Sequence, residues 1–269
     1  MLVITKIGRQ KNNPERYNIY INENYSFAVD EGTLIKFGLQ KGKILEQLEI
    51  DDIVYDDEIA KAFNKALNYL SYQMRSEHEV RQKLLSGGSG ASVVEEAIRK
   101  LERLGFLNDE SYSKALLETR KRTAKKGPGA IRQDLMKKGI DKNLQEQVLQ
   151  GYSHEEQVKL AGELATKQVR SGTGKTPVQV KQKIQDLLLR KGYSFTVVKE
   201  VLEHIQIERE DDEWGDLVSG QGDKIWRKYS AKFTGNERKN KVKQALYQKG
   251  FPLEVINRFI EQKEIEEHE

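Results

Sequence analysis

The sequence predicts a mainly α-helical protein, in which tandem three-helix repeats form an elongated curved array behind a small β-rich N-terminal domain. The first reason is a recurring helix end: Lys138-Gly139-Ile140, Lys191-Gly192-Tyr193 and Lys249-Gly250-Phe251. Lysine near the last turn complements the helix dipole, and glycine after the cap adopts the left-handed backbone that closes a helix. These signals lie 53 and 58 residues apart, so one unit recurs. The second reason is composition, since 37% apolar and 33% charged residues suit small units with thin cores.

Residues 1–58 are predicted to form the β-rich domain. Three runs rich in aromatic and β-branched residues are predicted strands, at 3–7, 17–21 and 25–29, with a turn at Asn22-Glu23-Asn24 between the last two. A short helix is expected over residues 33–39, and residues 50–55 are expected to be extended. Three strands with one apolar face are enough for a small independent sheet.

The first repeat is predicted over residues 59–108 and the second over 109–151. The first begins with a helix whose apolar residues recur at spacings of three and four: Phe63, Ala66, Leu67, Leu70 and Met74. Two capping boxes, at residues 76–79 and 92–95, are expected to open its other helices. In the second repeat, Asn108 and Asp141 are expected helix caps, and Pro128 suits the first turn of the helix between them.

The third repeat is predicted over residues 152–207, and the fourth over 208–269 with an acidic C-terminal tail. The predicted helix starts are a capping box at 153–156, Thr176-Pro177, Ser194, Asn236 and Pro252. Trp226 shares an apolar stripe with Tyr229 and is predicted to be core. Trp214 lies among acidic residues and is predicted to be exposed for a partner.

The sequence offers no pattern typical of catalysis, metal binding or cofactor binding. It has no cysteine, and His78, His154, His204 and His268 lack the spacing of four residues that places two ligands on one helix face. The stretch Ser171-Gly172-Thr173-Gly174-Lys175-Thr176 resembles a phosphate-binding loop, but Val169 stands where that motif needs its first glycine. We expect a flexible connector there, and a protein that is not an enzyme and needs no cofactor or metal.

No apolar run approaches the roughly 18 residues of a membrane span, and the lack of cysteine suits a reducing compartment. We therefore expect a cytoplasmic protein with no membrane partner.

A cluster of basic residues, which we call the basic segment, is the candidate binding site. It lies at the end of the first helix of the second repeat, in the next loop and in the following helix: Arg120, Lys121, Arg122, Lys125, Lys126, Arg132, Lys137 and Lys138. Any one of these is explained by a solvated helix face, but together they repel one another unless an anionic partner screens them. Because aromatic residues for base stacking are scarce nearby, any DNA contact is expected to reach phosphates, to weaken with salt and to be nearly indifferent to sequence.

Part of this pattern resembles a known family. The residues concerned are Ala66-Leu67-Asn68-Tyr69-Leu70-Ser71, Met74-Arg75-Ser76, Glu79-Val80, Leu101-Glu102-Arg103-Leu104-Gly105-Phe106-Leu107-Asn108-Asp109, Gly127-Pro128 and Leu135-Met136-Lys137-Lys138-Gly139-Ile140. In this order they resemble the RecX family of bacterial recombination regulators. The N-terminal sheet and the fourth repeat resemble features of its longer Gram-positive members. The resemblance implies a cytoplasmic protein of recombination and DNA repair that binds the RecA recombinase filament, dampens its strand exchange and ATP hydrolysis, and has some affinity for nucleic acid.

Two functions stay open at this point. In the first, the repeats lie against a RecA–DNA filament and bridge its protomers, with the basic segment supplying attraction. In the second, the three-helix units resemble helix-turn-helix modules and make a stand-alone DNA-binding protein that selects a duplex sequence. Binding to bare DNA across a salt series, with and without the filament, separates the two. We expect the chain to be a monomer in both cases.

Overall fold

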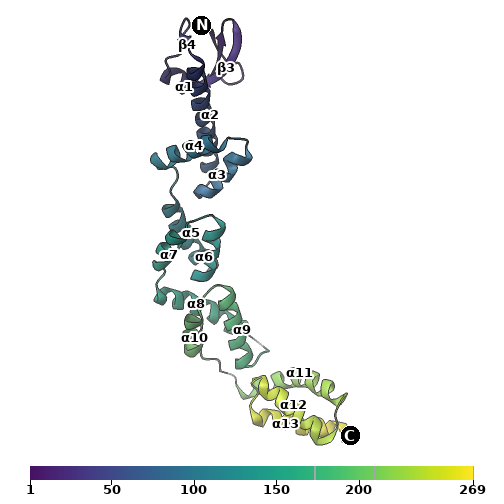
Figure 1. The fold of residues 1–269 in the computed structure, drawn as a ribbon. Helices are drawn as coiled ribbons and strands as arrows, with labels where there is room; N and C mark the ends of the chain where they lie inside the picture. Colours follow the sequence, from purple (N-terminus) through teal and green to yellow (C-terminus); the bar gives the residue numbers. More distant parts are fainter. Residues whose placement is uncertain (173, 209, 269) are drawn as a thin grey trace. The chain divides into compact units, whose positions relative to one another are not determined.

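The computed structural model describes residues 1–172, 174–208 and 210–268. Within these residues the chain has four strands and thirteen helices, which confirms a mainly α-helical fold with a β-rich N-terminus (Figure 1). The chain divides into two compact units. Residues 1–116 and 135–146 form the first, and residues 117–134 and 147–269 form the second.

The first unit begins with a four-stranded antiparallel sheet of order β3-β2-β1-β4. Its strands are β1 (Leu2–Arg9), β2 (Arg16–Ile21), β3 (Asn24–Asp30) and β4 (Ile44–Leu45), so the three predicted strands are confirmed. The predicted short helix is α1 (Glu31–Lys36). The sheet buries Ile4, Ile19 and Val29 against the first turns of α2 (Gln47–Leu70), as alternation of apolar side chains on one face requires (Figure 1).

The prediction of an extended segment at residues 50–55 is wrong, because these residues belong to α2. Six residues with apolar side chains at both ends fit either period, and the burial pattern shows which one holds. Ile50, Ile53 and Asp57 are buried at helical spacings of three and four, facing the sheet. Glu46 and Glu49 form the capping box that starts this helix.

A buried carboxylate ties α2 to the sheet. Asp57 accepts hydrogen bonds from the Arg16 guanidinium at 2.8 Å and from the Asp30 backbone N–H at 2.9 Å, and it pairs with Lys61 at 2.8 Å. Burial alone would raise the pKa of Asp57, but these hydrogen bonds outweigh it and hold the pKa below its ordinary value. The sheet and the helix therefore share one charged anchor.

The rest of the first unit contains the first set of three helices. The second half of α2 packs with α3 (Glu77–Ser86) and α4 (Ala91–Arg103) around Ala66, Val80, Leu84 and other apolar residues. The capping box of Ser76 and Glu79 is confirmed. The second predicted box is wrong, because α4 begins after Gly90 and Ser92 lies inside its first turn. Met74 also departs from the predicted stripe, since α2 ends at Leu70 and Met74 is exposed.

The next three helices are α5 (Asp109–Ala124), α6 (Pro128–Lys137) and α7 (Lys142–Gln150). The expected caps are confirmed. The Asn108 side chain accepts from the Ser111 N–H and the Asp141 carboxylate accepts from the Asn143 N–H, each at 2.8 Å. Pro128 is the first residue of α6, where its missing N–H costs no hydrogen bond.

The remaining helices, all in the second unit, form two further sets of three. The first set is α8 (His154–Arg170), α9 (Pro177–Arg190) and α10 (Phe195–His204), and the second is α11 (Asp211–Ser230), α12 (Gly235–Gln248) and α13 (Leu253–His268). Each set encloses its own apolar core. Side-chain caps at Ser153, Thr176 and Ser194 are confirmed.

Two predictions in the last set are wrong. The N-cap of α12 is Thr234 and not Asn236, which lies in the first turn. Trp214 is half-buried and not presented to a partner, because its ring packs edge-on against Phe251 with centroids 5.9 Å apart. The core position of Trp226 is confirmed, at 5% exposure.

The three recurring glycines do more than end helices, because each lies against the start of an earlier helix. All three have left-handed backbone, with φ of 72° at Gly139, 88° at Gly192 and 85° at Gly250. A Cβ atom at these positions would overlap His78, Ala130 and Val178 respectively. These neighbours are the second or third residues of α3, α6 and α9. We call each such contact a repeat joint.

Hydrogen bonds reinforce each repeat joint. The carbonyl that precedes the glycine accepts from the cap of the earlier helix: the Lys138 carbonyl from the Ser76 hydroxyl at 2.7 Å, and the Lys249 carbonyl from the Thr176 hydroxyl. In the middle joint no side-chain hydroxyl is available, and the Gly127 N–H donates to the Lys191 carbonyl at 2.8 Å. One device therefore recurs three times, twice through a side chain and once through the backbone.

The Ser76→Ala variant tests whether the N-cap residue of α3 also stabilises the repeat joint at Gly139. The Ser76 hydroxyl accepts from the Glu79 N–H and donates to the Lys138 carbonyl, and the residue is fully buried. Its removal should lower the free energy of unfolding by about 2–3 kcal/mol, of which about 1 is the cap and the rest the unpaired carbonyl. Ser153→Ala is the matched control, because Ser153 caps α8 and makes no joint among the described residues. It should cost about 1 kcal/mol. Equal losses in urea denaturation of the two variants would contradict a role in the joint.

Candidate functional site

The structure pairs most of the basic segment with carboxylates of the same chain. The Arg120 Nε and the Lys126 Nζ both reach one Asp134 oxygen, at 2.8 and 2.7 Å. Burial alone would raise the pKa of Asp134, but the hydrogen bond from Lys126 and the nearby Arg120 charge lower it. These two cations are therefore held together by a carboxylate from α6.

Lys121 is buried, at 6% exposure, and faces the protein interior. Its ammonium pairs with Glu118 at 2.8 Å and Glu156 at 2.7 Å, and lies 5.0 Å from the centre of the Tyr152 ring. Burial would lower the pKa of Lys121, yet the two hydrogen-bonded carboxylates outweigh it and raise the pKa. Lys121 is a structural cation and contributes little to any outer surface.

The middle repeat joint holds the loop that carries Lys125 and Lys126. Lys125 has left-handed backbone with φ of 46°, and its ammonium pairs with Glu163 of α8. The Tyr193 hydroxyl donates to the Lys125 carbonyl at 3.0 Å, and the Lys191 ammonium donates to the Ala124 carbonyl at 2.8 Å. The end of α5 is therefore fixed by the residues on both sides of Gly192.

The remaining four residues of the basic segment differ from one another in their surroundings. Lys138, in the first unit, pairs with Glu79 at 2.6 Å, and this contact helps to lower the pKa of Glu79 against the opposing effect of burial. Arg122, Arg132 and Lys137 have exposed side chains. Among the described residues, no carboxylate lies within ion-pair distance of Arg122 or Lys137. Carboxylates of the same chain thus neutralise Arg120, Lys121, Lys125, Lys126 and Lys138, and the mutual repulsion of these five residues needs no outside anion.

The structure contains a second basic surface that was not predicted from the sequence. A groove of about 710 Å³ lies between α9, α11 and the end of α12, and Lys175, Lys183, Lys224 and Lys249 line it. We call it the lysine groove. Its four lysines are spread over 75 residues of sequence, so no local run of charge marks it. Lys175 belongs to the loop that resembles a phosphate-binding motif. The structure places Thr176 there as the cap of α9, as expected, while Thr173 lies outside the described residues.

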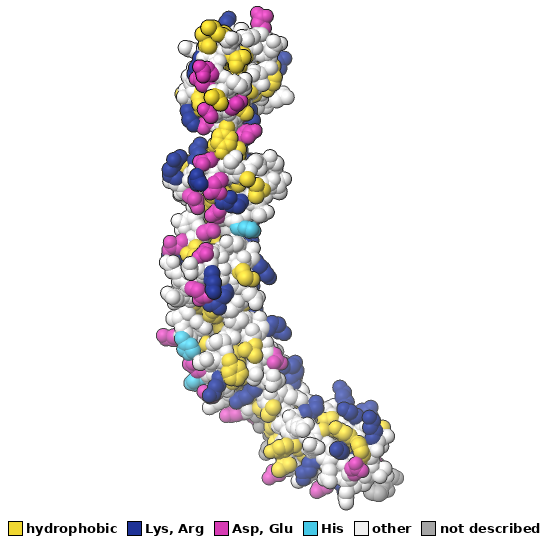
Figure 2. Space-filling model, viewed as in Figure 1, with side chains coloured by type: hydrophobic (Ala, Val, Ile, Leu, Met, Phe, Trp, Pro, Cys, Tyr) yellow, Lys and Arg dark blue, Asp and Glu magenta, His cyan; other side chains and the backbone are white. Residues whose placement is uncertain are grey.

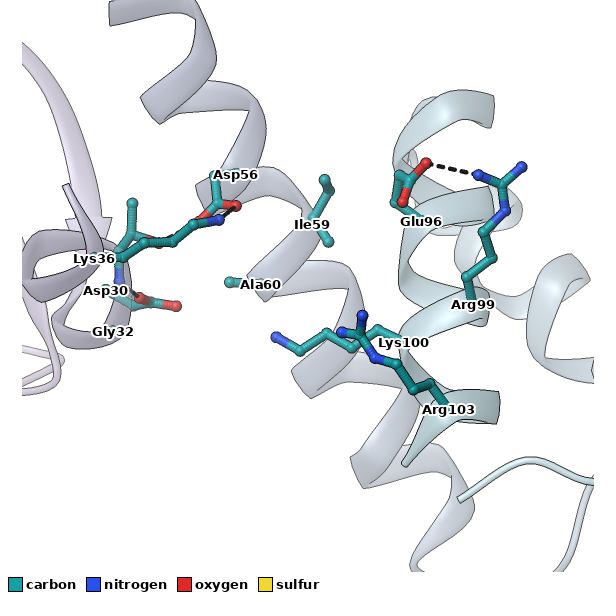
Figure 3. Close-up of a pocket in the computed structure, with 11 residues that line it drawn as sticks. Asp30, Gly32, Lys36, Asp56, Ile59, Ala60, Glu96, Arg99, Lys100 and Arg103 are labelled. Carbon is teal, nitrogen blue, oxygen red and sulfur yellow. Dashed lines mark hydrogen bonds and ion pairs between the residues drawn. The ribbon is translucent and has the colours of Figure 1, made fainter. Parts of the chain in front are cut away.

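A second hollow, of about 580 Å³, lies between α1, α2 and α4 in the first unit. Figure 3 shows Lys100 and Arg103 of α4 on one side of it, and Lys36 and Asp56 on the other. Lys36 pairs with Asp56 and Arg99 with Glu96, so both cations and carboxylates line this hollow. Such a mixed lining does not select an anion or a cation, and we assign this hollow no ligand.

The part of the chain that the structure describes contains neither a group of side chains placed to hold a metal ion nor a membrane-spanning helix. Among the described residues, no group of three or more histidine, cysteine, aspartate or glutamate side chains is placed to hold a metal ion. None of the described helices is both long enough and apolar enough to cross a bilayer.

Comparison with known families decides the identity of the fold. A model described as the regulatory protein RecX N-terminal domain matches residues 2–46. Models of the first and second RecX three-helix domains match residues 62–101 and 108–149, and that of the third domain matches two segments, 155–202 and 211–260. The chain belongs to the RecX family. The resemblance predicted from residues 66–140 is confirmed, and the third-domain model recognises both of the last two sets of helices.

Relatives of known name agree with this assignment. A RecX regulatory protein from Halalkalibacterium halodurans is 40% identical over 264 residues, which are 97% of this chain and 99% of the relative. The RecX regulatory protein of Bacillus subtilis is 37% identical over 265 residues, 98% of this chain and all of the relative.

Solved RecX structures match as well. A crystal structure of regulatory protein RecX aligns with a TM-score of 0.66 and 36% identity over 76% of this chain and all of the solved chain. RecX from Lactobacillus salivarius aligns with a TM-score of 0.53 and 37% identity over 56% of this chain and 99% of that one.

Proposed function

We propose that this chain regulates the RecA recombinase in the cytoplasm, by binding its filament on DNA and damping ATP hydrolysis and strand exchange. Family membership carries the proposal, because relatives named RecX regulatory protein align with nearly the whole chain. The role in recombination and DNA repair follows from the same resemblance.

The architecture supports binding to a repeating partner. Stacked helical units make extended binding surfaces, and several weak contacts on one chain reinforce one another by raising the effective concentration of each. A regulator that binds one conformation of the filament more tightly than the next shifts the population toward it and so slows the ATPase cycle. The chain would act as a monomer with no cofactor.

Within the basic segment, we assign the direct contact to its exposed cations. Arg120, Lys121, Lys125, Lys126 and Lys138 hold carboxylates of their own chain, so using them would require breaking those pairs. Arg122 and Lys137 are exposed and need no such exchange. Electrostatic attraction between exposed charges mainly raises the rate of association, and it weakens as the salt concentration rises.

Reversing both charges, by Arg122→Glu with Lys137→Glu, should raise the concentration needed for half-inhibition of the RecA ATPase at least about fivefold, or about 1 kcal/mol. The measurement is ATP hydrolysis on single-stranded DNA at fixed RecA and increasing regulator. Lys11→Glu with Lys41→Glu is the matched control, because it makes the same change of charge on exposed loops of the N-terminal sheet. Inhibition by the folded double variant at the wild-type concentration would remove the basic segment from the mechanism.

The same assay tests the regulatory function itself. Adding bare duplex DNA should leave inhibition unchanged if the filament is the target. If bare duplex removes the inhibition in proportion to its concentration, the chain is a stand-alone DNA-binding protein instead. A wild-type chain that neither binds the filament nor alters its ATPase would refute the proposal.

A further inference from the structure

The middle helix of each set of three ends in the same sequence pattern. In α3, α6, α9 and α12, a valine or isoleucine is followed four residues later by a leucine, and four residues after that by a glycine with left-handed backbone. The two apolar residues of each pattern are fully buried, as core positions one helical turn apart should be: Val80 and Leu84, Ile131 and Leu135, Ile184 and Leu188, and Val242 and Leu246.

The residue directly after each of these leucines is large and apolar, yet it faces outward. We call it the exposed apolar position, and its exposure is 40% at Leu85, 62% at Met136, 41% at Leu189 and 62% at Tyr247. Closure of the helix explains its neighbours but not this residue. The Leu135 carbonyl accepts from the Ile140 N–H at 3.2 Å, and α3, α9 and α12 close in the same way through their own leucines. The core and the helix end therefore leave the exposed apolar position without a role inside the chain.

Duplication of an ancestral helix does not by itself account for four apolar side chains at this position. The next residue is also exposed in every copy, and there the four copies have diverged in charge and size, as Ser86, Lys137, Arg190 and Gln248. A solvated helix face favours polar residues, and isolated apolar ones on it are scattered at random. Retention of a large apolar residue beside a freely varying one points to a surface that becomes covered.

The residues around each exposed apolar position indicate the chemistry of what covers it. Residues three and four places earlier lie on the same face of a helix. In three of the four helices these are a cation and a glutamine: Arg81 and Gln82, Arg132 and Gln133, and Lys243 and Gln244. In α9 they are Gln185 and Asp186, and the exposed cation Arg190 follows Leu189 instead. Figure 2 shows apolar side chains reaching the surface of the helical part of the chain with Lys and Arg side chains close by. An apolar centre beside hydrogen-bond donors suits a small apolar pocket whose rim carries carboxylate or carbonyl oxygens.

We propose that the exposed apolar positions insert into apolar, acceptor-rimmed pockets on protomers of the RecA filament. Four copies of one patch fit a partner that offers many copies of one pocket, whereas a partner with a single pocket would use one patch and leave three uncovered. A filament is such a repeating partner. This docking rests on the regulatory function proposed above and supplies its contact residues. It gives the chain an apolar contact, in addition to the electrostatic attraction of the basic segment, and an apolar contact does not weaken as salt rises.

Leu189→Gln and Tyr247→Gln test the docking in two helices that contribute nothing to the basic segment. Glutamine is a good helix former and both sites are exposed, so helical content and the urea midpoint should not change. Loss of one apolar contact should raise the concentration needed for half-inhibition of the RecA ATPase about fivefold in each single variant. The double variant should raise it about 25-fold, because the effects of independent contacts multiply. Leu189→Met, which keeps the apolar contact, should inhibit like the wild type.

Ile35→Gln with Leu48→Gln is the matched control, because both residues are more exposed than any of the four and lie in α1 and α2, outside the middle helices. It should leave the half-inhibiting concentration unchanged. Wild-type inhibition by the folded Leu189→Gln, Tyr247→Gln double variant would overturn the docking while leaving the regulatory function intact, and so would an equal loss in the control. A wild-type chain that does not bind the filament would refute the regulatory function and the docking together.

Photo-cross-linking identifies the occupant directly. Benzoylphenylalanine in place of Tyr247 keeps an aromatic side chain at the exposed apolar position, and the full chain carrying it is illuminated on RecA filaments assembled on single-stranded DNA. The expected product is a covalent adduct with RecA, whose cross-linked peptide contains apolar residues next to aspartate or glutamate. Cross-linking only to a second copy of this chain would assign the position to self-association, and cross-linking only to DNA would assign it to nucleic acid. Either result would overturn the proposal.

Discussion

Gly192→Ala should lower the stability of the second unit by about 2–5 kcal/mol. The left-handed backbone at Gly192 costs an alanine about 1–2 kcal/mol, and overlap of its Cβ with the Ala130 backbone adds about 1–3. Because that neighbour is backbone, it cannot move aside as the end of a long side chain would. The added methyl group should therefore open the middle joint and leave the individual helices formed.

Hydrogen exchange followed by mass spectrometry measures this locally. The N–H groups of Gly127 and Gly129 donate across the joint to Lys191 and Gly192, at 2.8 and 2.9 Å, and should lose protection in the variant. Gly105→Ala is the matched control. Gly105 has a similar φ of 75°, but its Cβ would meet no atom within 4 Å, so only about 1–2 kcal/mol is expected. Similar effects of the two substitutions would mean that these glycines only end helices.

Asp57→Asn should destabilise the N-terminal sheet by about 3–5 kcal/mol, because it leaves the largely buried Arg16 guanidinium without its counter-charge. Asp56→Asn is the matched control at the next residue. Its partner Lys36 is mostly exposed, so a loss below about 1 kcal/mol is expected. Urea denaturation followed through the NMR amide signals of Ile19 and Val29 reports on the sheet itself. Equal losses in the two variants would show that Asp57 is no anchor.

The same carboxylate gives the sheet a predictable response to acid. The pKa of Asp57 in the folded state lies below its ordinary value of 3.8, so the folded state holds this proton less tightly than the unfolded chain. Its contribution is complete above about pH 4–5 and disappears as the pH falls through the folded-state pKa. The Asp57→Asn variant should lack this part of the acid sensitivity.

The sequence predicts best those features whose cause lies within a few residues. Local chemistry predicts the three glycines that end helices, the caps at Ser76 and Thr176, and the strands of the sheet. The prediction for residues 50–55 is wrong because six residues are too few to distinguish the period of a strand from that of a helix. Helix α2 also runs through residue 58, and the proposed repeat boundaries at 58, 108, 151 and 207 stay predictions. The elongated curved form of the array stays a prediction as well.

The candidate site was less predictable because its electrostatics depend on residues far along the chain. Lys125 meets Glu163, and Lys121 meets Glu156, at separations that no local pattern of charge encodes. The lysine groove has the opposite character, since four separated lysines converge where the sequence shows no cluster. A local count of charges along the sequence therefore overestimates the free positive charge of the basic segment and does not reveal the lysine groove.

Each repeat joint consists of a backbone carbonyl oxygen, one hydroxyl or N–H donor and a glycine, so it places few demands on the amino acids around it. Neighbouring positions can diverge in evolution without undocking one helical module from the next. Duplication of a whole module then yields a copy that already fits its template, in keeping with the recognition of residues 155–202 and 211–260 by one and the same domain model.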